Sequence, residues 1–543
     1  MPLLTPSRAL VVLVSFLLVS FLWTFGLPHQ YATPTLPITS HGTQPEKPVV
    51  GQLIPEPLVE GAGGGDGTSD TGKVGDTKDK DTPTTLTTKY VASPTISPSA
   101  ANVGPETSCK DVRGASDVMV IVRTSKAEMD GKVPVHLKTL LSCVSNFAIF
   151  SDYAETIDGF PLYDALDTIT NTTKSAHNEF LEYDKMQEDK EYRPSVGKTR
   201  ALDKWKFLPM VYKTAVMVPS HRFYFFIEAD TSLSWTNLLQ WLDRPDYRIP
   251  YYSGAPKIID DKRYAQHGPG IMLSYGALQQ YITTYEERYV TLWESHVGAE
   301  CCGDLALAKA MKESRVEYYS SFPLLQTSTP STLDWTQKFW CTPIVSWQHM
   351  STAEIDTVWD AHKDWTQEHG WAVPYVHRNA FEHFVKPNLA EKKDDWDNIS
   401  SDTHIKAEKG RQEQLAKQKA EDPTGKTSSE KPKDSTKDTP KADDSPSKRD
   451  SPDADKVGAT VVNAADSPSN CQAFCHQTDD CLQWKHTTAG DGECHLGKAL
   501  RLGAQVEHPK ADEKWTSGFI LDRITKVTDE WGRCEKPEWR FNQ

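Results

Sequence analysis

One uninterrupted apolar stretch constrains the fold more than any other part of the chain: residues 223–227 read FYFFI, and Glu228 and Asp230 follow at once. A run of aromatic and β-branched residues predicts a strand that is buried on both faces, as in the centre of a parallel sheet. Ligands of open α/β sheets bind beyond the carboxyl ends of the strands, where carboxylates can hold a divalent cation against a diphosphate. The alternative is that Glu228 and Asp230 only end the strand and cap the next helix, since Ser234 and Asn237 are also capping residue types.

Strand and helix patterns alternate on both sides of this stretch. Short apolar runs predict strands at residues 118–122, 147–150, 251–257 and 271–273. Apolar residues at helical spacing predict helices at residues 135–144, 202–218, 238–242, 276–291 and 304–312. Strands that alternate with helices in this way predict an α/β domain with a parallel sheet, which we place at residues 109–400.

The N-terminal part of the chain predicts a membrane anchor. Residues 9–27 are apolar without a break and are long enough to cross a bilayer as a helix, with Arg8 before them and Pro28 after them. We expect a cytoplasmic tail at residues 1–8, a transmembrane signal anchor at 9–27 and a disordered, Thr- and Pro-rich stalk at 28–108. A cleaved signal peptide on a secreted protein is the alternative.

Cysteines indicate an oxidising compartment. The chain has ten of them, an even number that favours disulfides in the secretory pathway. Asn171 and Asn398 begin glycosylation sequons that fit the same compartment. A disulfide between Cys109 and Cys143 is plausible, and the partners of Cys301, Cys302 and Cys341 stay open.

The C-terminal part divides into a polar tract and a small cysteine-rich unit. Residues 401–458 alternate Lys with Asp and Glu, which predicts a disordered, charged linker. Residues 459–543 contain Cys471, Cys475, Cys481 and Cys494, and a unit of this size needs cross-links to be stable. Disulfides are favoured over a zinc site that would use these cysteines with His476 and His495.

Net charge excludes one class of partner. The chain carries a formal charge of -15 and has no basic stripe beside aromatic residues, so we expect no nucleic-acid partner.

Four short motifs in the predicted α/β domain carry candidate chemistry, and they occur in a fixed order. They are Glu228-Ala-Asp230, the HGPGIMLS stretch at residues 267–274, ECCGDLALA at 300–308 and WCTPIVSWQH at 340–349. Asp304 in the third motif is either a first-turn helix acid or a general base. His349 in the fourth is either a structural histidine or a metal ligand beside Asp230.

In this order the four motifs resemble the Fringe and core 1 β1,3-galactosyltransferase family of inverting glycosyltransferases, and its fungal branch most of all. The resemblance covers about residues 116–398, and anchor, stalk and luminal domain match a single-pass type II protein of Golgi or other secretory-pathway membranes. It implies a GT-A fold, which is a Rossmann-like nucleotide-sugar domain, with Mn²⁺ as cofactor. It also implies a UDP-sugar donor, with galactose as the best guess, and a glycoprotein glycan as acceptor in β1,3 linkage.

The resemblance also implies roles for individual residues. Asp304 matches the catalytic base, and Asp230 and His349 match the metal ligands. Residues that match nucleotide-sugar contacts are Thr124, Glu228, Asp230, Gly268 and Gly270. Glu228 and Ala229 depart from the family's usual Asp-Asp pair, as His267 and Pro269 depart from its usual residues around the glycines.

The cysteine-rich unit resembles a PAN/apple module in its cysteine spacing and in the WTSG sequence at residues 515–518. Such modules bind proteins or carbohydrates, and a tethered one raises the local concentration of its ligand. The alternative function is therefore an inactive GT-A-like membrane protein that binds carbohydrate or protein. The sequence leaves open the donor sugar, the acceptor, the linkage and the oligomeric state.

Overall fold

The computed structural model describes residues 108–421, 464–507 and 513–539. The segments expected to form the tail, the anchor and nearly all of the stalk lie outside these ranges. In the ranges themselves, no helix is both long enough and apolar enough to span a membrane.

A mixed sheet of eight strands forms the centre of the α/β domain, in the order β3-β4-β2-β1-β5-β8-β7-β9. Its inner strands β4, β2, β1 and β5 run parallel, while β3 and β8 run antiparallel to their neighbours, and β9 is parallel to β7. The predicted α/β class with a parallel-rich sheet is thus confirmed. The strands are β1 Val118–Arg123, β2 Phe147–Ser151, β3 Glu155–Ile157, β4 Phe160–Asp164, β5 Phe223–Glu228, β7 Tyr251–Ile259, β8 Lys262–Ser274 and β9 Glu317–Ser320.

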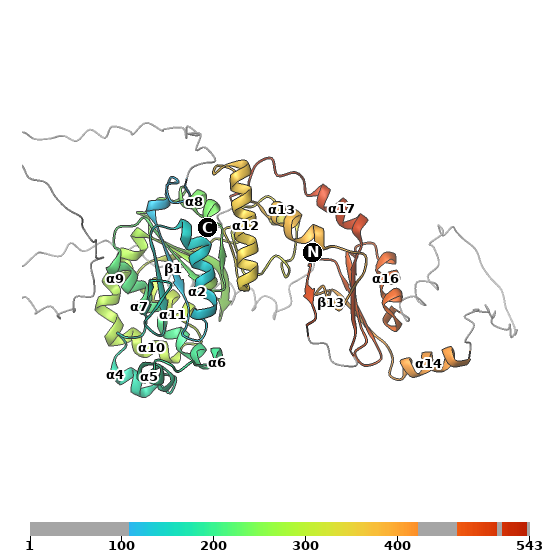
Figure 1. The fold of residues 1–543 in the computed structure, drawn as a ribbon, viewed down its shortest axis with the longest axis horizontal. Helices are drawn as coiled ribbons and strands as arrows, with labels where there is room; N and C mark the ends of the chain where they lie inside the picture. Colours follow the sequence, from blue (N-terminus) through green and yellow to red (C-terminus); the bar gives the residue numbers. More distant parts are fainter. Residues whose placement is uncertain (1–107, 422–463, 508–512, 540–543) are drawn as a thin grey trace, which may run out of the picture. The chain divides into compact units, whose positions relative to one another are not determined.

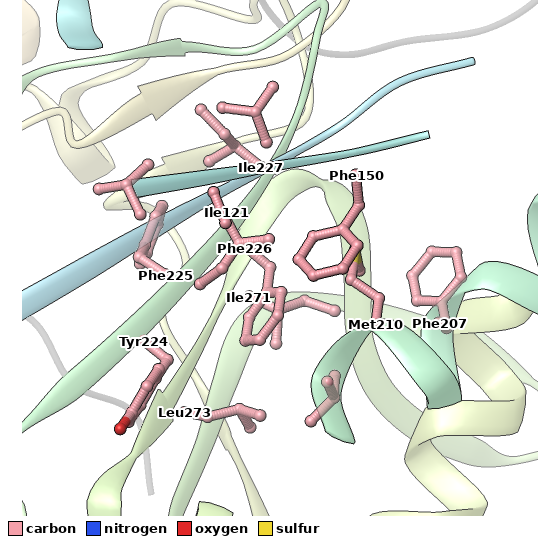
Figure 2. Close-up of a cluster of buried hydrophobic side chains, with 14 of the residues drawn as sticks. Ile121, Phe150, Phe207, Met210, Tyr224, Phe225, Phe226, Ile227, Ile271 and Leu273 are labelled. Atoms are coloured by element: carbon pink, nitrogen blue, oxygen red, sulfur yellow. The ribbon is translucent and has the colours of Figure 1, made fainter. Parts of the chain in front are cut away.

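Strand β5 is buried on both faces, as its sequence predicts. Successive side chains of a strand point to opposite faces. Phe225 packs edge-to-face on Trp241, with ring centroids 6.1 Å apart, while Phe226 lies with Phe207 and Met210 on the other face. Figure 2 shows this apolar packing around Ile121, Phe226 and Ile271. The end of β5 is therefore held on a rigid element.

Helices cover the sheet in two groups (Figure 1). Helices α7, α9 and α11 pack on one another, and α2 packs on α12. Their bounds are α2 Met129–Lys138, α3 Leu140–Cys143, α4 Asn171–Ala176, α5 Phe180–Glu188, α6 Val196–Thr199, α7 Asp203–Met217, α8 Trp235–Leu242, α9 Tyr275–Arg288, α10 Glu294–Ala299, α11 Gly303–Glu313, α12 Thr352–His369 and α13 His377–Ala380.

A second, three-stranded sheet lies beyond the end of β5. Its order is β10-β11-β6, with β6 Ser232–Leu233, β10 Leu325–Gln326 and β11 Ser346–Trp347. Strand β11 pairs antiparallel with β6, so that Trp347 lies opposite Ser232. This pairing brings the segment after β11 beside the segment before β6.

The cysteine-rich unit is built around a five-stranded sheet, β12-β18-β15-β16-β14, on which α16 packs. Bounds are β12 Lys393–Asp394, β14 Thr403–Lys406, α16 Pro468–Gln477, β15 Gln483–Thr487, β16 Glu493–Gly497 and β18 Trp515–Phe519. The two-stranded pair β13 Trp396–Asp397 and β17 Ala504–Gln505 and the helix α17 Leu521–Glu530 complete it.

The start of the predicted linker was placed wrongly. Residues Thr403–Lys406 form the edge strand β14, and Arg411–Glu421 form helix α14. Polar composition predicted disorder here because one face of an edge strand can stay solvated, so its sequence lacks an apolar run. The remainder of that segment, residues 422–458, lies outside the described ranges.

All ten cysteines are paired. The expected Cys109–Cys143 disulfide is present, Cys301 pairs with Cys302, and Cys341 pairs with Cys534. Within the cysteine-rich unit the pairs are Cys471–Cys494 and Cys475–Cys481. Thiolate ligands for a metal are therefore excluded in this unit.

The two sequons differ in exposure. Asn171 is exposed at the start of α4. Asn398 is fully buried, and its side-chain amide donates hydrogen bonds to the carbonyl oxygens of Trp484 and Gly518. The folded chain therefore presents only the first of these two sequons for modification.

Candidate active site at the end of strand β5

Asp230 lies just beyond the carboxyl end of β5, at the edge of the sheet where α/β proteins bind ligands. His136 binds the carbonyl oxygen of the preceding residue, Ala229, at 3.0 Å through its Nε2. The backbone before Asp230 is therefore anchored, and the Asp230 side chain, 26% exposed, reaches solvent.

His349 meets Asp230 because β11 pairs with β6. The backbone N–H of Met350 donates to the carbonyl oxygen of Asp230 at 2.9 Å, and His349 Nδ1 lies 3.5 Å from Asp230 Oδ2. His349 has a φ of 62°, in the left-handed region that non-glycine residues rarely adopt and that often marks functional sites.

The spacing of this pair suits a shared cation. Ligand atoms about 2.1 Å from one metal ion lie about 3–3.5 Å apart when they occupy neighbouring coordination positions. Asp230 and His349 supply one oxygen and one nitrogen, and both side chains reach solvent. The two residues fit a divalent metal ion whose other positions are left for water and phosphate oxygens.

Asp304 stands in the first turn of α11 and is fully buried. His267 Nδ1 lies 2.9 Å from its Oδ2, and Lys257 Nζ lies 3.6 Å from the same oxygen. The backbone N–H of Leu305 donates to the other oxygen, Oδ1, at 2.9 Å. Both carboxylate oxygens are thus engaged, and a ligand meets His267, whose side chain is 29% exposed, before it meets Asp304.

The environment of Asp304 keeps it ionised. Burial raises the pKa of this carboxyl, but the hydrogen bond from His267 and the charges of His267 and Lys257 outweigh burial, so that the pKa lies below its usual value. The carboxylate of Asp304 accepts a hydrogen bond from Nδ1 of His267, so that whenever this imidazole is neutral its Nε2 carries the free lone pair.

Gly268 joins the strand that carries His267 to the segments that carry Asp230 and His349. It follows His267 directly, and its carbonyl oxygen accepts a hydrogen bond of 2.6 Å from Thr231, which follows Asp230. A Cβ at this position would lie 1.7 Å from Nε2 of Gln348, the residue before His349. Only glycine therefore permits this close approach of the two segments.

Gly270 has a different constraint. Its φ is 115°, and a Cβ would lie 2.8 Å from the Phe225 ring. The missing side chain lets β8 pass close to Phe225 of β5, so glycine is needed here for packing and not for contact with a ligand.

Two predicted nucleotide-sugar contacts remain, and their side chains differ: Glu228 forms an ion pair with Arg123, whereas the hydroxyl of Thr124 has no partner among the described residues. Both oxygens of Glu228 bind the Arg123 guanidinium, at 2.8 Å from Nε and 2.6 Å from Nη2. Arg123 also contacts Asp203 at 2.9 Å. Thr124, directly after β1, has a buried Oγ1 without a hydrogen-bond partner among the described residues.

Sequence reasoning missed two features of this site. One is the Arg123–Asp203 ion pair, which extends to Lys206 and from there to Asp152, each Lys206 contact being 2.9 Å. The other is the pairing of His267 with Asp304. Neither has a local signal, because each joins residues from separate segments.

A cavity of about 330 Å³ lies in another part of the domain. Trp235, Trp359, His362 and Trp371 line it, together with the Cys109–Cys143 disulfide. None of the predicted site residues lines this cavity. A search for the site by cavity volume would therefore not select the Asp230–His349 or the Asp304–His267 pair.

Fold and site together define an α/β protein with a candidate metal and acid–base site at the edge of its sheet. No family model matches the chain, and no curated protein matches it. One similar solved structure is that of a glycosyltransferase involved in the glycosylation of the major capsid of PBCV-1. It has 11% sequence identity and a TM-score of 0.24, and the match covers 45% of this chain and 98% of that chain. Site residues cannot be transferred at this level of similarity.

Proposed function

We propose that the protein is a metal-dependent inverting glycosyltransferase that moves a sugar from a UDP-sugar to an acceptor hydroxyl. The observation that carries the proposal is the pairing of residues from distant segments: Asp230 with His349 at 3.5 Å, and Asp304 with His267 at 2.9 Å. Gly268 links the two pairs through its contacts with Thr231 and Gln348. A cation site next to an acid–base pair is the equipment that transfer from a nucleotide sugar needs.

Asp230 and His349 would hold Mn²⁺. The bound ion would neutralise charge that develops on the departing diphosphate. Thr124 Oγ1, which is buried without a partner, would donate to the nucleotide beyond β1. Glu228 would act indirectly, because its bonds to Arg123 hold the end of β1 against the end of β5.

The acceptor proton would pass to His267. Asp304 is fully buried and both of its oxygens are hydrogen-bonded, which supports moving the role of proton acceptor from Asp304 to the partly exposed imidazole. In this scheme Nε2 of His267 takes the proton of the attacking hydroxyl. Asp304 orients the ring and stabilises the imidazolium that forms. The oxygen attacks the anomeric carbon from the face opposite the diphosphate, so the configuration inverts in one step.

The finer specificity is also a proposal. Galactose as donor, a glycoprotein glycan as acceptor and β1,3 linkage agree with the motif order. An oxidising secretory compartment, such as the Golgi, agrees with the complete pairing of the cysteines. The expected anchor at residues 9–27 would place the enzyme on that membrane.

The test is a screen of UDP-sugars for Mn²⁺-dependent transfer or hydrolysis, followed by two substitutions. We expect His267→Ala to lower kcat about 10²–10⁴-fold, the usual contribution of a general base, without loss of UDP binding. Asp304→Asn would lower kcat as well, and it would shift the acid limb of the pH–rate profile because it changes the support of His267. Transfer at the wild-type rate by His267→Ala would remove His267 from this role. If Asp304→Asn alone were inactive, Asp304 itself would be the base.

A second function has one observation in its favour. Glu228 is fully engaged by Arg123, and a domain without a free second acid could bind sugar or protein without catalysis. Mn²⁺-dependent thermal stabilisation by UDP separates the two functions, because an active site binds the nucleotide with the metal. A chain that binds glycans but shows no UDP effect would be the binding protein.

A further inference from the structure

Three potential metal ligands meet on one face of the cysteine-rich unit. Strand β14 pairs antiparallel with β16, with His404 opposite His495 and Lys406 opposite Glu493. Residues that lie opposite each other share a face of the sheet, and so do residues two apart on one strand. His404, Glu493 and His495 therefore point to the same side, while Cys494 points into the core, where it forms its disulfide with Cys471.

Their ligand atoms are close enough to share one ion. His404 Nε2 lies 3.1 Å and His495 Nε2 lies 3.3 Å from the same oxygen of Glu493, Oε2. The two imidazole rings are stacked with centroids 4.1 Å apart, and one ligand atom from each of the three residues lies within 4.8 Å of the others. Ligand atoms about 2.1 Å from one zinc ion in tetrahedral geometry lie about 3.4 Å apart, close to the two distances from Glu493 Oε2.

Partial exposure of the three side chains suits an ion with an open position. The side chain of His404 is 38% exposed, that of Glu493 is 22% exposed and that of His495 is 15% exposed. Lys406 Nζ binds the other oxygen of Glu493, Oε1, at 2.8 Å, which leaves Oε2 directed at the histidines. The three ligands therefore meet at a place that an ion can reach from solvent.

We propose that His404, Glu493 and His495 form a zinc site. Two imidazoles and one carboxylate are a donor set that Zn²⁺ prefers, with a water molecule in the fourth position. The cysteines of this unit are all in disulfides, so the ion is bound without thiolates.

A bound ion would hold the edge strand β14 in the sheet of the cysteine-rich unit. His404 belongs to β14, which follows the α/β domain in the chain, whereas Glu493 and His495 belong to β16 inside the cysteine-rich unit. A bound ion joins the two strands through side chains in addition to their backbone pairing. Occupancy of the site therefore controls how firmly β14 stays in the sheet.

Isothermal titration of Zn²⁺ into the EDTA-treated, dialysed full chain tests the site. We expect binding that is weakened at least tenfold by His404→Ala, by His495→Ala and by Glu493→Gln. His476→Ala is the matched control, because His476 is an exposed histidine of the same unit outside the cluster, and it should bind as the wild type does. A second control, His349→Ala, separates this site from the one beyond β5 and should retain the binding.

Two further readouts guard against variants that fold poorly. Hydrogen exchange of the β14 amides should slow when Zn²⁺ is added to the wild type, while that of β15 serves as the folding reference. Co²⁺ should give visible absorption bands with the wild type and lose them in Glu493→Gln. Zn²⁺ binding that all three substitutions leave unchanged, or no binding at millimolar Zn²⁺, would overturn the proposal.

Discussion

His349 Nδ1 lies 3.5 Å from Asp230 Oδ2, and the antiparallel pair β6–β11 holds the two residues together. The left-handed backbone of His349 turns its ring toward solvent at this place, where the side chain is 63% exposed. Such an exposed side chain contributes little to the core, so its removal should cost the ligand-free chain little stability.

His349→Ala and Asp230→Asn are therefore expected to abolish the Mn²⁺-dependent stabilisation by UDP and to change the thermal stability of the ligand-free chain little. At a UDP concentration 100 times Kd the wild type should gain about 2.7 kcal/mol, measured as a shift in Tm with Mn²⁺ against EDTA. His369→Ala, at the end of α12, is the control. An unchanged UDP effect in both site variants would contradict the metal assignment.

Gly268→Ala should destabilise the chain by about 1–3 kcal/mol, since the new methyl group overlaps the Gln348 side chain. Gln348 is buried and accepts a hydrogen bond from Gln266 at 3.1 Å, so it has little room to move. Adding Gln348→Ala to Gly268→Ala should restore part of the lost Tm. A double variant that is no more stable than Gly268→Ala would show that the overlap is not with Gln348.

Acid should destabilise the fold through His377. This ring is fully buried, with Nδ1 2.7 Å from the Thr342 carbonyl oxygen and Nε2 2.8 Å from the Gln326 amide nitrogen. Burial lowers the pKa of His377 from 6.5 to about 3. Between these values the unfolded chain binds the proton more readily, so stability falls with falling pH by about 1.4 kcal/mol per pH unit.

The measurement is the free energy of unfolding in urea from pH 7 to pH 5. His377→Gln should reduce the slope of the unfolding free energy against pH by about 1.4 kcal/mol per pH unit, whatever its effect on stability at pH 7. His383→Gln, at an exposed position, should keep the slope. Equal slopes in the wild type and His377→Gln would contradict the assignment.

Loss of the Cys341–Cys534 disulfide should cost about 2–5 kcal/mol, because it closes a loop with a sequence separation of 193 residues. Trp340 contributes to the same contact by packing on Trp531, with ring centroids 5.0 Å apart. The check is the Tm of Cys341→Ser/Cys534→Ser against the wild type under oxidising conditions. A Tm within 1 °C, on the order of the error of ordinary melts, would contradict this estimate.

Much of the domain could be predicted from local pattern. The apolar runs at β1, β2 and β5 and the helical spacing of α7 and α11 lie within one or two residues of the observed elements. The helix predicted at 135–144 was wrong at its start and missed a break: α2 begins at Met129 and includes Pro134, and Thr139 separates it from α3, which ends at Cys143. Proline disfavours a helix interior, but burial of Val133 and His136 keeps the turn helical.

Strands with a mostly polar sequence were harder to predict than the apolar ones. Strand β8 begins at Lys262, yet only its apolar end at 271–273 could be predicted, because residues 262–270 are mostly polar or glycine. The stretch around His267 and Gly268 was therefore not predicted as part of a strand. The residues on both sides of this stretch pair with β7 in a hairpin that turns at residues 260–261, and the stretch is thereby part of one continuous strand.

The same limit applies to the candidate site. Motif order selected Asp230, Asp304 and His349, and the structure places His349 beside Asp230 and His267 beside Asp304. The relation of His267 to Asp304 could not be predicted, because it depends on how α11 meets β8. Burial of Asp304 is likewise a tertiary property, and it changes which atom a substrate can reach.

The Cys341–Cys534 bridge has a consequence for chain integrity. Cys341 precedes β14 and α14, while Cys534 follows α17, so the bond spans the whole stretch from 421 to 464. A protease that nicks the backbone anywhere in that stretch yields two fragments that remain one covalent molecule until a reductant is added. On a gel run without reductant, the nicked protein would keep the mass of the intact one.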